Sequence, residues 1–177
     1  FENMATHLHE REKELRFSAH RDSLTGLRNT TAYKRWVEEF DKDIEKKTAK
    51  FGIVVFDLNQ LKQTNDNYGH DIGDKLIATA AKVISDVFKR SPVFRIGGDE
   101  FLAILRHRDL EDCEKLFVQL DLECAKARIE EKEEIPISIA RGFAVFDLDK
   151  DLSFNDVFKR ADYAMYENKR KNKKVTI

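Results

Sequence analysis

The sequence predicts one α/β domain preceded by a helix, and three observations lead to this prediction. The chain has 177 residues, an ordinary length for one domain and a short one for two. Stretches with apolar residues at three- and four-residue spacing alternate with short, β-branched apolar runs. No repeat or low-complexity segment interrupts this alternation.

Residues 1–20 are charged and have the spacing of a helix. Their apolar positions fall near a heptad seam, which Arg11 and Ser18 interrupt. Two interpretations therefore remain: a solvated leader helix, or the end of a dimerising linker from an upstream domain. We divide the chain into this linker helix, residues 1–20, and a domain over residues 21–177.

Apolar spacing, together with the glycines and prolines that end regular structure, sets the expected elements of the domain. In order they are a helix over 33–44, a strand over 51–56, a short helix from a cap at Asn59 through Asn67, a helix from Asp71 or Gly73 to Phe88, strands over 93–96 and 101–105, a helix over 113–124, a strand over 135–146, and a last helix that Ser153-x-x-Asp156 begins. The run Phe51–Phe56 is apolar on both faces, as in a central strand. Gly97-Gly98-Asp99-Glu100 is expected to close a hairpin.

Charge and hydropathy exclude several classes of protein. The chain has 32 Lys and Arg against 33 Asp and Glu, whereas a nucleic-acid or anionic-membrane binder needs a basic excess. The longest apolar run, Phe51–Phe56, is far shorter than the ~20 residues that cross a bilayer. We expect no nucleic-acid partner, no membrane contact by this segment, and a cytoplasmic location, either alone or as the cytoplasmic part of a larger, membrane-anchored protein.

Cys113 and Cys124 are the two cysteines of the chain. In a helix they would share one face but lie ~16 Å apart along the axis, which is too far for a disulfide. They are expected to be free thiols that face the core.

Carboxylates stand at the ends of two predicted strands. Asp57 closes an apolar strand, and Asp99 and Glu100 occupy the hairpin tip. If the two strands are neighbours, these hard oxygen ligands converge and suit Mg²⁺. The alternative is that they mark only turns and strand ends. Gly97 and Gly98 permit positive φ and a close approach of a ligand to the backbone.

The heptapeptide Arg95-Ile96-Gly97-Gly98-Asp99-Glu100-Phe101 resembles the signature of the GGDEF domain, the diguanylate cyclase family. Further motifs match in order from Ser18 to Val175. These are Asp22-x-Leu24-Thr25-Gly26-Leu27-x-Asn29, Phe56-Asp57-Leu58-Asn59, Lys62, Asn65-Asp66, Tyr68-Gly69-His70-Asp71-x-Gly73-Asp74 and Ala161-Asp162-x-Ala164-Met165-Tyr166-x-x-Lys169. The resemblance implies a mostly antiparallel central sheet wrapped by helices, as in nucleotidyl cyclases and polymerase palms.

The resemblance also implies a reaction, in which two GTP molecules condense to cyclic di-GMP and two pyrophosphates. Asp57, the Leu58 carbonyl and Asp99 would hold Mg²⁺, with Mn²⁺ as an alternative, and Glu100 would support the metal or the proton transfer. Two metal ions ~4 Å apart can lower the pKa of a 3′-hydroxyl and stabilise the leaving pyrophosphate.

Asn65, His70 and Asp74 match positions at the nucleotide base. A carboxylate can accept from guanine N1–H and the exocyclic amine, whereas adenine would leave Asp74 unpaired. A cyclase that accepts ATP is therefore disfavoured. As alternatives, Asp74 could stabilise a helix N-terminus, Asn65 could be a polar residue near a helix end, and His70 could donate within a turn.

Three lysines match phosphate-facing positions of the family. Lys62 would stabilise the transition state, and Lys169 and Lys173 on one helical face would straddle the β- and γ-phosphates. Solvated lysines are the alternative in each case. The family usually has arginine at position 173 and glycine at 172. Here Asn172 allows the helix to continue, and Lys173 supplies a point charge in place of the bidentate guanidinium of arginine.

One departure bears on regulation. Many relatives carry an inhibitory product site, Arg-x-x-Asp, whose two positions here are Phe88 and Ser91. We expect no feedback inhibition of that type.

The sequence thus predicts a diguanylate cyclase domain that acts on GTP as a homodimer. A sensory or dimerising domain is expected upstream of it. The alternative is a non-catalytic GTP-binding or interaction module with the same fold. A P-loop NTPase is excluded, because no glycine begins a G-x-x-x-x-G-K-[ST] run.

Overall fold

The structure, a computed structural model, describes residues 19–131 and 134–174, with side chains described as far as residue 170. Residues 19 and 20 form a turn, and the rest of the helix predicted over residues 1–20 lies outside the described residues. Within the described ranges, no helix combines the length and the apolar character needed to cross a membrane.

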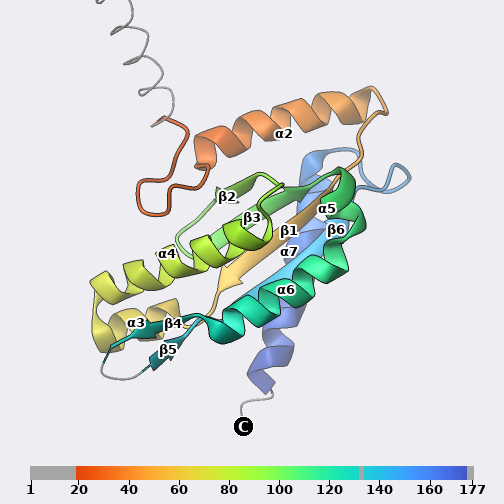
Figure 1. The fold of residues 1–177 in the computed structure, drawn as a ribbon. Helices are drawn as coiled ribbons and strands as arrows, with labels where there is room; N and C mark the ends of the chain where they lie inside the picture. The colour runs from red at the N-terminus through yellow and green to blue at the C-terminus, as the bar shows by residue number, and fades with distance from the viewer. Residues whose placement is uncertain (1–18, 132–133, 175–177) are drawn as a thin grey trace, which may run out of the picture.

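Helices surround an antiparallel sheet, as predicted (Figure 1). The elements are α2 (Thr30–Glu45), β1 (Gly52–Leu58), α3 (Leu61–Tyr68), α4 (His70–Val87), β2 (Val93–Arg95), β3 (Glu100–Leu105), α5 (His107–Glu111), α6 (Cys113–Lys126), β4 (Arg128–Glu130), β5 (Glu134–Pro136), β6 (Ile139–Val145) and α7 (Phe154–Lys174). The main sheet has the strand order β2-β3-β1-β6, and each neighbouring pair is antiparallel. Strands β4 and β5 form a separate hairpin.

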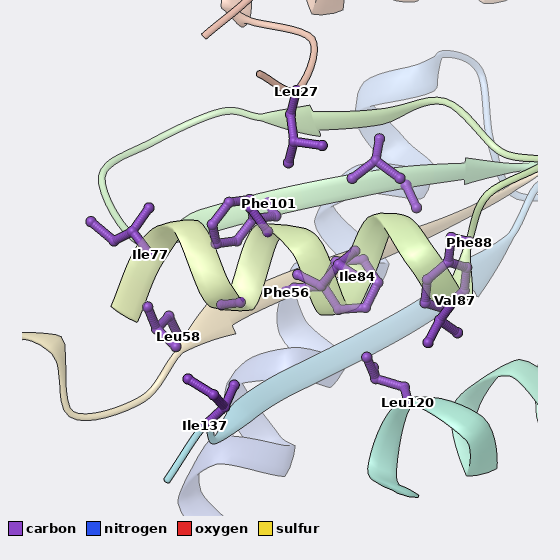
Figure 2. Close-up of a cluster of buried hydrophobic side chains, with 14 of the residues drawn as sticks. Leu27, Phe56, Leu58, Ile77, Ile84, Val87, Phe88, Phe101, Leu120 and Ile137 are labelled. Atoms are coloured by element: carbon purple, nitrogen blue, oxygen red, sulfur yellow. The ribbon is translucent and has the colours of Figure 1, made fainter. Parts of the chain in front are cut away.

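Strand β1 is buried along its whole length because hydrophobic clusters lie on both faces of the sheet. Val54, Phe56 and Leu58 belong to a cluster shared with α4 and α6, which Figure 2 shows. Ile53 and Val55 point the other way, into a cluster shared with α2 and α7. The prediction of a central strand is confirmed.

A glycine in β6 sets how closely α7 approaches the sheet. A Cβ on Gly142 would lie 2.0 Å from the Met165 nitrogen and 2.1 Å from the Ala161 oxygen, both backbone atoms of α7. Any larger residue would therefore push the helix away from β6. Helix α7 also continues through Lys174, past Asn172, as predicted.

Two local predictions are wrong. Asn59 does not cap α3: Gln60 occupies the cap position with φ 66° and no side-chain cap bond, because Asn59 continues the ladder of β1 toward Ser138. The strand predicted over 135–146 is divided. Its first part pairs with β4, and its second part, β6, pairs with β1. Helix α4 begins at His70, one residue before the predicted Asp71.

Helix α5 and strand β4 were not predicted, whereas the other elements agree with the predictions. Strands β2 and β3 form the expected hairpin, with Arg95 opposite Phe101. Cys113 and Cys124 are free and pack, partly buried, against the cluster shared with α4 and α6. Burial raises the pKa of the Cys124 thiol to about 11, so this thiol stays protonated at neutral pH.

Candidate active site

The pairing of β1 with β3 brings the predicted metal ligands together at one end of the sheet. Asp57 lies opposite Glu100 in the ladder, and the Leu58 N–H donates to the Asp99 carbonyl at 2.9 Å. Asp57 is only 8% exposed. Residues more than 40 positions apart in the chain therefore meet, because antiparallel pairing places the end of β1 beside the start of its neighbour in the sheet, β3.

The carboxylates at this end repel one another. Burial raises the pKa of Glu100, and the charges of Asp99, Asp57 and Asp162 raise it further, while Lys169 opposes the shift. The Lys169 Nζ donates to Asp57 Oδ1 at 2.5 Å. One lysine thus balances several acidic groups, and the site favours an additional cation.

The donor atoms at this site suit a divalent cation. Mg²⁺ takes one or two protein carboxylates and completes its shell with phosphate and water. Asp57 and Asp99 could supply those carboxylates and the Leu58 carbonyl a further oxygen, and Lys169 places a positive charge beside Asp57. In the ranges that the structure describes, no group of three or more His, Cys, Asp or Glu side chains has the arrangement of a metal cluster. Two carboxylates and a carbonyl leave coordination positions for phosphate and water, so the ligand set fits a cation that brings phosphate ligands with it.

A cavity of about 670 Å³ opens beside these groups. It lies within the ~300–1,000 Å³ range of small-molecule sites. Its lining residues are Leu58, Asn59, Gln60, Leu61, Lys62, Gln63, Asp66, Asn67, Asp99, Ser138 and Lys169. Lys62, Asp99 and Lys169 thus share one cavity. Lys173 lies one turn beyond Lys169 on α7, where side chains are not described.

The three predicted base-reading residues lie at the junction of α3 and α4, away from this lining. Asn65 rests directly on α4, because a Cβ on Gly73 would lie 1.8 Å from Asn65 Oδ1. His70 and Asp74 are exposed and stand four residues apart on α4, so they share a helical face. The structure therefore groups these residues beside the cavity's α3 wall and does not place them in the cavity itself.

The glycine pair differs from the expectation in its backbone conformation. Neither Gly97 nor Gly98 adopts positive φ, because the N–H groups of Ile96 and Gly97 both donate to the Glu100 carbonyl and hold the turn. A Cβ on Gly97 would lie 2.7 Å from Glu100 Oε2, whereas Gly98 faces open space. Gly97 therefore makes room for the Glu100 carboxylate, and Gly98 leaves the backbone accessible.

Arg95 holds this loop in place through hydrogen bonds that the sequence alone does not indicate. The Arg95 guanidinium donates to the Gly98 carbonyl at 2.8 Å and to Asp22 at 3.1 Å. Asp22 also accepts from the Thr25 N–H and hydroxyl. Burial alone would raise the pKa of Asp22, but the hydrogen bonds from Thr25 and Arg95 lower it below its ordinary value. The Asp22-x-x-Thr25-Gly26 turn was visible in the sequence, but its contact with Arg95, 73 residues away, was not.

The segment that carries Phe88 and Ser91 makes contacts within the domain. Phe88 is fully buried, and the Ser91 hydroxyl donates to the buried Asp109 at 2.7 Å. Arg90 donates to the other oxygen of Asp109 at 2.9 Å. Phe88 thus belongs to the core and Ser91 bonds within the domain, whereas the Arg90 side chain stays about half exposed while it holds Asp109.

Comparison with known proteins identifies the family. The family described as "Diguanylate cyclase, GGDEF domain" matches residues 19–175. The chain belongs to the GGDEF-domain family. Members of this family are in general diguanylate cyclases, which use a divalent metal ion, bind GTP and act as dimers with regulatory domains.

Individual relatives agree with this assignment. The coiled coil and GGDEF domain of DgcB from Caulobacter crescentus, in complex with c-di-GMP, has a TM-score of 0.82 at 25% identity over 95% of this chain and 90% of that one. The GGDEF domain of DgcB, also in complex with c-di-GMP, has a TM-score of 0.77 at 27% identity over 87% and 89% of the two chains.

An uncharacterized membrane protein of Staphylococcus haemolyticus is 29% identical over 144 residues, which cover 80% of this chain and 40% of that protein. The chain thus spans less than half the length of this curated relative.

Proposed function

We propose that this domain is a diguanylate cyclase that converts two GTP molecules to cyclic di-GMP and two pyrophosphates. The main observation that supports the proposal is that Asp57, Asp99 and Glu100 lie together where β1 ends and β3 begins. This group lies beside a cavity that Lys62 and Lys169 line. In each of two steps, a 3′-hydroxyl oxygen bonds to an α-phosphorus, the bond to the β-phosphate oxygen breaks, and the hydroxyl proton leaves.

The protein's share of this chemistry is positioning and charge balance. Asp57, the Leu58 carbonyl and Asp99 would hold Mg²⁺, or Mn²⁺ in its place, and Glu100 would support the metal or accept the hydroxyl proton. The bound cation would lower the pKa of the 3′-hydroxyl and neutralise the leaving pyrophosphate. Lys169 would leave Asp57 and pair with the triphosphate, together with Lys173, while Lys62 would face the charge that develops during transfer.

Base selection is assigned to the junction of α3 and α4. Asp74, exposed on the first turns of α4, would accept from guanine N1–H and the exocyclic amine, Asn65 would meet the O6 and N7 edge, and His70 would approach the nucleotide nearby. Adenine would leave the Asp74 carboxylate without donors, at a cost of about 1–3 kcal/mol.

The reaction requires two copies of the domain. Each 3′-hydroxyl must attack the α-phosphate of the other GTP, so two domains must face each other about a two-fold axis. We assign residues 1–20 to a linker helix that joins the domain over 21–177 to an upstream sensory or dimerising domain. Dimerisation by that region would raise the local concentration of the second domain.

The test is incubation of the chain with Mg²⁺ and GTP, with and without a constitutive dimer fused ahead of Phe1, followed by chromatographic analysis of the products. We expect cyclic di-GMP and pyrophosphate, at a higher rate in the fusion, and none from Asp99→Asn. GTP binding without any product, in the fusion as well, would favour the second candidate, a non-catalytic GTP-binding or interaction module.

A further inference from the structure

Two hydrogen bonds join Asn59, just after β1, to Ser138, just before β6. The Asn59 N–H donates to the Ser138 carbonyl at 2.9 Å, and Asn59 Nδ2 donates to Ser138 Oγ, also at 2.9 Å. They continue the ladder one residue past its last pair, Leu58 opposite Ile139. The chain is thus clamped where it leaves the sheet and enters the wall of the cavity.

The clamp fixes the direction of the Leu58 carbonyl. This carbonyl and the Asn59 N–H belong to one trans peptide group, which is planar, so they point in opposite directions. The N–H points to β6, and the carbonyl therefore points to the side of β3. The Leu58 N–H donates to the Asp99 carbonyl on that same side. The Leu58 oxygen is consequently directed toward the loop that carries Asp99.

The Leu58 oxygen is also available for a ligand. Outside the helices and strands of the described ranges, no backbone N–H donates to it. Leu58, Asn59, Asp99 and Ser138 all line the same cavity. A backbone oxygen that faces a cavity without a backbone donor is suited to accept a cation.

The residue that follows the clamp adds a second constraint. Gln60 has φ 66°, a left-handed conformation that costs a side-chain-bearing residue of order 1 kcal/mol. Its carbonyl accepts from the Thr64 N–H at 2.9 Å and so begins α3, which carries Lys62. The clamp thus precedes a strained turn at which α3, with its predicted phosphate-facing lysine, begins.

We propose that Asn59 and Ser138 are a positioning pair that aims the Leu58 carbonyl at the cation site. Neither side chain is assigned contact with the cation. The pair acts through the peptide between Leu58 and Asn59, as outer-shell hydrogen bonds orient ligands at other metal sites. This inference rests on the proposed cyclase function and deepens it.

The test measures Mn²⁺ binding by electron paramagnetic resonance, with a non-hydrolysable GTP analogue present, in the full chain. Asn59→Ala and Ser138→Ala are each expected to raise the Kd for Mn²⁺ about tenfold. The double variant should be no weaker than the weaker single variant, because both changes remove the same contact. Asn59→Asp should stay within about threefold of the parent, because the Ser138 hydroxyl can rotate and donate to the carboxylate.

Turnover supplies a second readout. Loss of positioning should lower kcat for cyclic di-GMP in Asn59→Ala and Ser138→Ala, with little change in the KM for GTP, since the base-reading residues are untouched. Ser153→Ala is the matched control, because it removes a serine hydrogen bond at the start of α7. It should lower thermal stability and leave the Kd for Mn²⁺ unchanged.

Unchanged Mn²⁺ affinity in both alanine variants, with only a lower melting temperature, would overturn the positioning role and leave the cyclase function intact. If Asn59→Ala cannot be purified folded, Ser138→Ala decides alone, since it removes the same side-chain hydrogen bond and, like Asn59→Ala, keeps the backbone bond. A parent chain that binds no Mn²⁺ with the nucleotide, or that makes no cyclic di-GMP, would overturn the proposed function and this inference together.

Discussion

Two kinds of buried carboxylate occur in this domain, and they are held differently. Asp109 and Asp151 are each 3% exposed, and both oxygens of each accept from fixed donors. Arg90 and the Ser91 hydroxyl donate to Asp109, and Arg160 and the Asp147 N–H donate to Asp151. These acids have the full complement of partners that a structural carboxylate needs.

Asp57 differs from both. Within the described ranges, its side-chain donor is Lys169, whose side chain is itself 30% exposed and lines the cavity. A lysine on a flexible stem can leave more easily than an arginine fork, so Asp57 is held by a partner that can be exchanged. The contrast separates carboxylates that build the fold from one that is available for a ligand.

The largest expected effect is that of Asp57→Asn on turnover. Losing this charge at the proposed cation site should lower cyclic di-GMP formation about 100- to 1,000-fold. Thermal stability should not fall, because Asp57 raises the pKa of Glu100 and its removal relieves that repulsion. Product chromatography and circular dichroism melting measure the two effects, and activity within tenfold of the parent would contradict the assignment.

Asp151→Ala should do the reverse. Arg160 and the Asp147 N–H would lose their acceptor, which we expect to lower the free energy of unfolding by about 1–3 kcal/mol. Urea titration measures this change. The Kd for Mn²⁺ with a GTP analogue should equal that of the parent, and a shift in that constant would place Asp151 in the functional site.

Lys169→Met should move two affinities in opposite directions. Without nucleotide, Mn²⁺ should bind about tenfold more tightly, because a competing cation beside Asp57 is gone. The KM for GTP should rise about tenfold, because a phosphate partner is lost. Lys159→Met, an exposed lysine earlier on α7, is the control and should change neither. A parallel shift of both affinities would show that Lys169 does not exchange partners.

The smallest expected effect concerns the region of Asp109. Because Phe88 is buried and Ser91 and Arg90 are engaged with Asp109, this surface should not bind product. Initial rates of GTP turnover should be unchanged when cyclic di-GMP is added up to the concentration of GTP. Strong inhibition that Arg90→Ala abolishes would make this contact a regulatory site. Asp109 would then no longer be a purely structural carboxylate.

The sequence alone predicted the parts of the site that are encoded locally. A carboxylate at the end of an apolar strand and a pair at a hairpin tip can be recognised within a few residues of the chain, and antiparallel pairing makes Asp57 and Glu100 neighbours. The positions of the helices other than α5 followed from apolar spacing in the same way, whereas α5, with five residues, is too short to show such a pattern.

Contacts between distant segments could not be predicted. Asn59 looks like a helix cap in the sequence, because the competing partner, Ser138, is 79 residues away. Arg95 reaches Asp22 across 73 residues, and the run around Ser138 is apolar enough to resemble one long strand. In each case a tertiary hydrogen bond or a change of sheet overrides the local preference.

The most direct test of the central claim is a crystal structure with Mg²⁺ and a non-hydrolysable GTP analogue. We expect a cation about 2.1 Å from oxygens of Asp57, Asp99 and Leu58. We also expect that the Lys169 Nζ has moved from Asp57 to a phosphate and that guanine lies against Asn65 and Asp74. A nucleotide bound elsewhere, or a Lys169 that still pairs with Asp57 beside a bound nucleotide, would contradict it.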